Sequence, residues 1–91
     1  MLDEAQQEAR RLAASLRQLD ADAFDNARAV VLALQTPISL DLLKGAAATL
    51  IELERQIPNG TLGVMIRVRL SRLQGLVNAM LDDNNQPPPA A

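Results

Sequence analysis

Hydrophobic residues recur at intervals of three and four along most of this chain, the spacing that places side chains on one face of an α-helix. Between Leu40 and Leu81 the pattern is interrupted once, at Pro58-Asn59-Gly60. Proline disfavours helical geometry in the residue before it, and Asn-Gly favours a turn. The pattern therefore predicts two helices, residues 38–57 and 62–81, which fold back on each other because so few residues connect them.

Each of these two predicted helices has a continuous apolar face that we expect to lie in the core. The face of the first consists of Leu40, Leu43, Ala47, Leu50 and Ile57, with Ala46 and Leu53 alongside. The face of the second consists of Ile66, Leu70, Leu73, Val77 and Met80. The second helix also begins with Val64, Met65 and Val68, which make its first turns apolar on more than one side. We expect contacts on two sides there, from two helices or from one helix and a second subunit.

Residues 3–35 contain neither glycine nor proline and are rich in good helix formers. We expect one continuous helix over this range, closed by Thr36-Pro37. The alternative is two helices separated at Asp20-Ala21-Asp22, because aspartate is a good N-cap and a poor residue for a helix interior. The fold class is accordingly all-α, a small antiparallel three-helix bundle with a long N-terminal helix. Residues 1–83 would form a single helical domain, and residues 84–91 a flexible, proline-rich C-terminal tail.

A helix of that length would extend beyond the two-helix hairpin and leave a leucine seam uncovered. We therefore assign Leu12, Leu16 and Leu19 to a protein interface, with a homodimer as the simplest means of burying them. The alternative is that the same seam packs on the hairpin of its own chain.

The composition removes most catalytic and metal-binding chemistry. The 91 residues include no histidine, cysteine, tryptophan or tyrosine, and a single phenylalanine. The usual general base, thiol nucleophile and nitrogen or sulfur metal ligands are therefore missing. Several carboxylates precede a basic residue by three positions, as Glu8 precedes Arg11, which is the spacing of ordinary ion pairs on a helix surface. We expect no enzymatic activity, no cofactor, no metal and no small-molecule substrate.

Nucleic acid binding is a more serious alternative. The net charge of −2 and the scarcity of aromatic residues argue against it. Between Asn59 and Leu81, however, the charged residues are Arg67, Arg69 and Arg72. Arg69 and Arg72 share a helix face, whereas Arg67 points to another side. We expect these arginines to meet acidic residues of the first helix or of a partner, and keep a small DNA-associated regulator as the alternative function.

Neither membrane insertion nor secretion is expected. The longest uncharged run, Ala29 to Leu40, is far shorter than the ~20 residues that span a bilayer, and the N-terminal residues are acidic. We expect a cytoplasmic protein. Its predicted function is that of a non-catalytic interaction module, a small adaptor, chaperone-like or regulatory protein that acts through helix-helix contacts, as a homodimer or with another protein.

Overall fold

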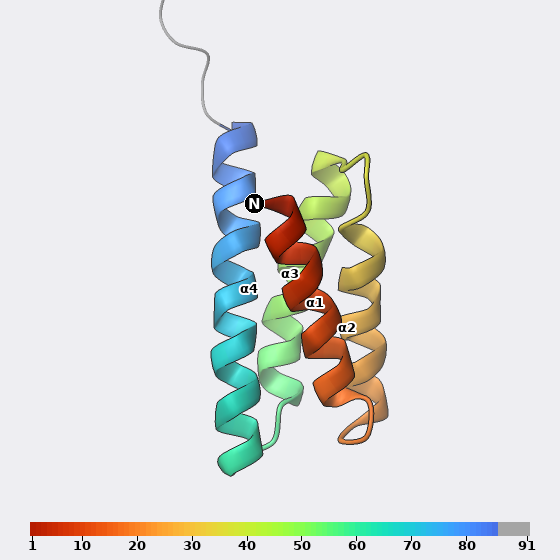
Figure 1. The fold of residues 1–91 in the computed structure, drawn as a ribbon, viewed down its shortest axis with the longest axis vertical. Helices are drawn as coiled ribbons and strands as arrows, with labels where there is room; N and C mark the ends of the chain where they lie inside the picture. Colours follow the sequence, from red (N-terminus) through yellow and green to blue (C-terminus); the bar gives the residue numbers. More distant parts are fainter. Residues whose placement is uncertain (86–91) are drawn as a thin grey trace, which may run out of the picture.

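The structure, a computed structural model, describes residues 1–85 and the side chains of residues 1–83. The described residues form four helices and no strand: α1 (Leu2–Leu16), α2 (Ala21–Ala33), α3 (Leu40–Gln56) and α4 (Thr61–Asn85). The helices run alternately down and up (Figure 1), so that consecutive helices are antiparallel. Each helix packs on two neighbours, because α1 and α3 both contact α2 and α4. The predicted all-α fold class is confirmed.

The predicted three-helix bundle with a long N-terminal helix is wrong, since residues 3–35 form two helices. Leu19 and Asp20 both donate their N–H groups to the Leu16 carbonyl, at 3.1 and 3.2 Å, as the chain turns after α1. Asp20 then caps α2 with extended backbone, and its carboxylate accepts the Ala23 N–H at 2.9 Å. A side chain that satisfies an orphan N–H group at a helix start stabilises a break here, despite the good helix formers on both sides.

Most of the other helix ends lie close to the predicted positions, and the end of α4 is the exception. Ser39 caps α3 by accepting the Leu42 N–H at 3.0 Å, so α3 begins at Leu40. The helix ends before Ile57, which is extended, as the following proline requires. Helix α4 continues past the predicted end at residue 81, to Asn85. The predicted tail, residues 84–91, thus begins within α4, and residues 86–91 lie outside the described residues.

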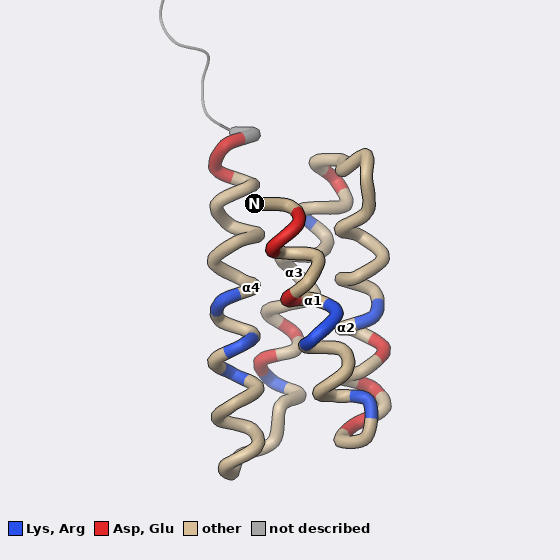
Figure 2. Tube along the Cα trace, in the orientation of Figure 1, with Lys and Arg blue, Asp and Glu red and all other residues tan. Residues whose placement is uncertain are grey.

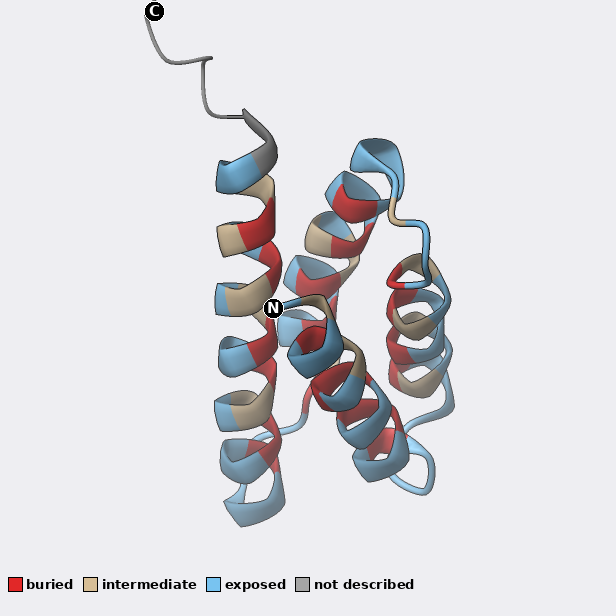
Figure 3. Ribbon diagram, turned by 45° about the horizontal axis from the view of Figure 1, so that its top comes forward, coloured by how far each residue is buried: buried red, intermediate tan, exposed pale blue. Residues whose placement is uncertain are grey.

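The core is an aliphatic interior to which all four helices contribute (Figure 3). The face predicted for α4 is buried at every position, and so are Leu43 and Leu50 of α3 and Ile57, which directly follows α3. Leu40, at the start of the predicted α3 face, is instead exposed, and Ala47 is only partly buried. The periodicity therefore identified the inward faces of both helices.

The connection between α3 and α4 depends on two glycines. Gly60 has a φ of 122°, a conformation that other residues rarely adopt. Gly63, in the first turn of α4, lies against the chain before the turn. A Cβ atom at Gly63 would lie 1.8 Å from the Pro58 carbonyl oxygen. The absence of a side chain at Gly63 is therefore what allows α4 to start so close to the end of α3.

Among the described residues, no helix combines the length and the apolar character that crossing a membrane requires.

Candidate functional site, a groove between α1 and α4

The leucine seam assigned to an interface is divided between the core and the surface. Leu12 and Leu16 have no exposed area and pack in the core of their own chain, whereas Leu19 is 38% exposed. The predicted overhang does not form, because α1 ends at Leu16 and the chain turns. Burial of Leu12 and Leu16 thus needs no second subunit.

Arg67 belongs to the α3–α4 connection. Its guanidinium donates to the Ile57 carbonyl at 2.8 Å and to Asn59 Oδ1 at 3.4 Å. Because Ile57 is the C-cap of α3, its carbonyl has no partner within the helix, and a cation there also complements the helix dipole. Arg67 therefore points away from the other two arginines of α4, as its position in the sequence indicated.

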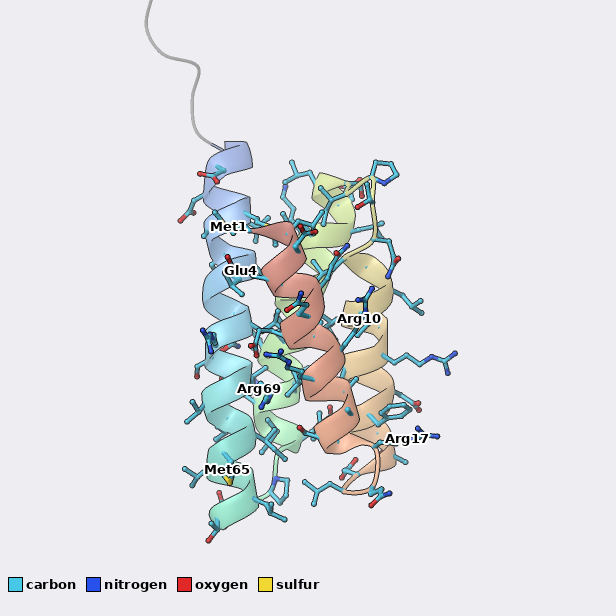
Figure 4. All side chains as sticks on the ribbon, in the orientation of Figure 1. Met1, Glu4, Arg10, Arg17, Met65 and Arg69 are labelled. Atoms are coloured by element: carbon cyan, nitrogen blue, oxygen red, sulfur yellow. The ribbon has the colours of Figure 1, made fainter. Side chains whose placement is uncertain are left out.

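Arg69 and Arg72 both meet Glu8 of α1. Arg69 Nη1 lies 3.6 Å from Glu8 Oε2, and Arg72 Nη1 lies 3.9 Å from Glu8 Oε1. Arg11, one turn further along α1, places its Nη1 3.6 Å from Glu8 Oε1. Figure 4 shows the Arg69 side chain between α4 and α1. Of the three arginines expected to meet acidic residues of the first helix or of a partner, Arg69 and Arg72 thus lie at one carboxylate of α1, whereas Arg67 does not.

This cluster carries more positive than negative charge. Three guanidinium groups share one carboxylate, and their distances of 3.6 to 3.9 Å exceed the 2.7 to 2.9 Å of charge-assisted hydrogen bonds. The Glu8 side chain is 8% exposed, and its Oε2 accepts no hydrogen bond although it is buried. The Arg11 and Arg72 side chains, in contrast, are 61% and 74% exposed. Their N–H groups remain accessible to a ligand.

The cluster lies in the middle of a groove between α1 and α4. Three hollows of about 250, 190 and 170 Å³ follow one another along the two helices. The first and second share Met65 and Arg69, and the second and third share Glu8, Arg11 and Arg72, so the three hollows adjoin one another in a row. We call this row of hollows the α1–α4 groove. No sequence pattern pointed to it, because it depends on which helices become neighbours.

The character of the α1–α4 groove changes along its length. The first hollow is mostly apolar, since Leu19, Leu62, Met65 and Ile66 line it beside Ser15 and Arg69. The second contains the arginine cluster, and the third ends at Glu4 and Leu76. An apolar end, a cationic middle and a mixed end are therefore arranged in that order.

A set of exposed apolar residues on α4 adjoins the groove. Leu62, Val64, Met65 and Val68 are each more than half exposed, and we call them the α4 apolar patch. Helix α4 contacts only α1 and α3, so within the described chain no helix covers this side. Figure 2 shows the first turns of α4 free of charged residues up to the arginines. The sequence showed that these turns are apolar on more than one side, but it could not show that they remain uncovered.

The described residues contain no group of three or more metal-ligating side chains that could hold a metal ion. No protein-family model matches the chain, and neither the curated proteins nor the solved structures gave a match.

Proposed function

We propose that this protein is a non-catalytic interaction module, a small adaptor, chaperone-like or regulatory protein that binds another protein through helix-helix contacts. The observation that carries the proposal is the α4 apolar patch. Monomeric proteins rarely leave contiguous large apolar side chains in water, and such patches mark interaction surfaces. Here four of them fall within the first turns of one helix.

The spacing of the patch favours a helical partner. Val64 and Val68 are four residues apart, and Met65 and Val68 are three apart, so their side chains form a ridge on α4. A helix of a partner laid alongside would contact successive members of this ridge, with its own side chains entering the adjacent groove.

The homodimer expected from the sequence relied on the exposure of Leu12, Leu16 and Leu19, and of these Leu12 and Leu16 are buried in their own chain while Leu19 is exposed. The burial of Leu12 and Leu16 leaves Leu19 as the remaining support for a homodimer, so self-association becomes an outcome to be measured. A DNA-associated function loses support as well. Arg67 is bound to the α3–α4 connection, while Arg69 and Arg72 turn to Glu8, so the three do not present one common surface to phosphate groups.

The test compares two doubly substituted chains. Met65→Lys with Val68→Lys introduces charge into the α4 apolar patch, and Leu32→Lys with Ile51→Lys does so at equally exposed positions of α2 and α3. Each immobilised chain is used to capture proteins from an extract of its source cells, with quantification by mass spectrometry. We expect a protein that the wild type and the control retain and the α4 variant loses.

Identical capture by all three chains would rule out the α4 apolar patch as the binding surface. Circular dichroism confirms that each variant is folded before capture. Light scattering over a range of concentrations gives the mass of the wild-type chain, and so measures self-association separately.

A further inference from the structure

We propose that the α1–α4 groove receives an amphipathic helix of a second protein, and that this helix carries carboxylates beside its apolar residues. The proposal rests on the proposed function, since it defines the chemistry of the partner that binds the same region. It is carried by the position of the arginine cluster next to the apolar end of the groove.

The apolar end supplies the anchoring contact. The first hollow has a volume of about 250 Å³ and is lined by Leu19, Leu62 and Met65. All three have exposed surface in the free protein, and Leu62 and Met65 are the most exposed. Aliphatic side chains of a partner that entered this hollow would remove apolar surface of both molecules from water, which is the main driving force of association.

The middle of the groove determines the charge of the partner. Arg11, Arg69 and Arg72 surround a single carboxylate, that of Glu8, at ion-pair distances too long for hydrogen bonds. An incoming carboxylate can accept paired N–H groups from Arg11 or Arg72, whose guanidinium groups are largely exposed. An incoming ammonium or guanidinium group would be repelled there.

The same charges disfavour a second copy of this chain as the occupant. In a twofold-symmetric dimer each subunit presents the same surface to the other. Two α1–α4 grooves facing each other would bring together Arg69 and Arg72 of both copies, and like charges placed opposite each other reduce affinity. The groove is therefore complementary to a different, acidic partner.

The dimensions of the groove indicate how the partner is patterned. From Leu62 to Leu76 the groove follows α4 for roughly 21 Å, about four helical turns. Arg72 lies two turns beyond Met65, roughly 10 Å along the axis. The partner helix should therefore carry its carboxylates about two turns from its apolar anchors, on the same face.

The probe is a synthetic helical peptide of about four turns, with leucines in its first two turns and glutamates on the same face two turns on. The matched peptide has lysine in place of each glutamate. Both are titrated into the full-length, isotope-labelled chain and followed by NMR. We expect the acidic peptide to shift resonances of α1 and α4 and to bind at least about tenfold more tightly than the lysine peptide. The affinity of the acidic peptide should fall as the salt concentration is raised.

Substitutions then test the cluster itself. Arg11→Gln and Arg72→Gln should each lower the affinity for the acidic peptide by about two- to fivefold, which is the effect expected of losing one exposed ion pair. Arg10→Gln is the matched control, because Arg10 is the adjacent residue and points away from α4 (Figure 4). Glu8→Gln should have the opposite effect and tighten binding by about two- to fivefold, since it removes the carboxylate that competes for the arginines. If the cluster only stabilised the fold, all three cluster substitutions would weaken binding of the acidic peptide, Glu8→Gln included.

Three outcomes would overturn the proposal. Equal binding of the two peptides would refute the assignment of charge but leave the α4 apolar patch as a binding surface. Failure of both peptides to shift α4 resonances would refute this occupant, while the capture experiment would still decide the proposed function. Concentration-dependent shifts in the groove of the chain alone would identify a second copy as the occupant.

Discussion

At Gly63 a hydrogen atom occupies the position where any other residue would place a carbon against the Pro58 carbonyl oxygen, 1.8 Å away. The neighbouring atoms are backbone, which cannot rotate aside as a flexible side chain would. We predict that Gly63→Ala lowers the free energy of unfolding by about 1 to 3 kcal/mol, as overpacking of well-packed sites does. Urea denaturation followed by circular dichroism measures the change.

Gly75 in the same helix provides the control. A Cβ atom at Gly75 would have no atom within 4 Å. Gly75→Ala should therefore stabilise the chain by about 0.5 to 1 kcal/mol, because alanine loses less conformational entropy in a helix. Equal effects of the two substitutions would mean that α4 does not approach Pro58 as closely as described.

The arginines of α4 should also differ in how much each contributes to the free energy of unfolding. Arg67 donates to the partly buried Ile57 carbonyl at 2.8 Å, whereas Arg72 is 74% exposed and makes one ion pair, at 3.9 Å. Arg67→Ala should lower the free energy of unfolding by about 1 to 2 kcal/mol, since it removes a hydrogen bond from a charged donor. Arg72→Ala should change it by less than about 0.5 kcal/mol. Thermal denaturation compares the two, and a larger loss in Arg72→Ala would contradict the assignment.

At the scale of elements, the separation of α1 from α2 depends on one side chain. The Asp20 carboxylate accepts the Ala23 N–H at 2.9 Å, and the helix that it caps has only 13 residues. Asp20→Ala should therefore destabilise the chain by about 1 kcal/mol, the usual loss for an N-cap. Asp22→Ala serves as the control, because Asp22 lies in the first turn of α2 but does not make the capping hydrogen bond. This substitution should lower the free energy of unfolding by less than Asp20→Ala does. Guanidinium denaturation of both variants measures the difference.

Periodicity was sufficient to predict α3 and α4, and it was insufficient for α1 and α2. In α3 and α4 the spacing of apolar residues and the turn signal at Pro58-Asn59-Gly60 agree. Around Asp20 two signals oppose each other. The good helix formers on both sides favour one continuous helix, whereas the aspartates favour the start of a new one. Helix propensities differ by too little to decide between one continuous helix and two. In the structure the chain forms two helices, and Asp20 caps the second.

At the scale of the whole molecule, the division into four helices determines what Leu16 does. Leu16 has no exposed area, whereas Leu19, three residues on, is 38% exposed. Leu16→Glu should therefore unfold the chain, because it places an unpaired carboxylate in the core. Leu19→Glu should remain folded, with a change of about 0.5 kcal/mol or less. Far-ultraviolet circular dichroism distinguishes them, and a folded Leu16→Glu monomer would restore the case for an interface on α1.

The candidate site could be predicted only in part. The sequence indicated that Arg69 and Arg72 share a helix face and that the first turns of α4 are apolar on more than one side. The expectation that all three arginines of α4 meet acidic residues, of the first helix or of a partner, fits Arg69 and Arg72 but not Arg67. It could not identify Glu8 as the carboxylate that receives them, because that contact depends on α1 and α4 being neighbours. Nor could it predict the α1–α4 groove, since a hollow is a property of two adjacent helices and not of either one.

The contact between α1 and α4 has a consequence for how the molecule opens. Among the described helices it is the one packed pair that is not consecutive in the chain. It brings the start of α1 and the end of α4 to the same end of the bundle (Figure 1). Detachment of α1 from α4 would therefore separate the first helix from the last without breaking any hairpin. A ligand bound across the groove would hold these two helices together, and the amides of α1 would then exchange their hydrogens with water more slowly.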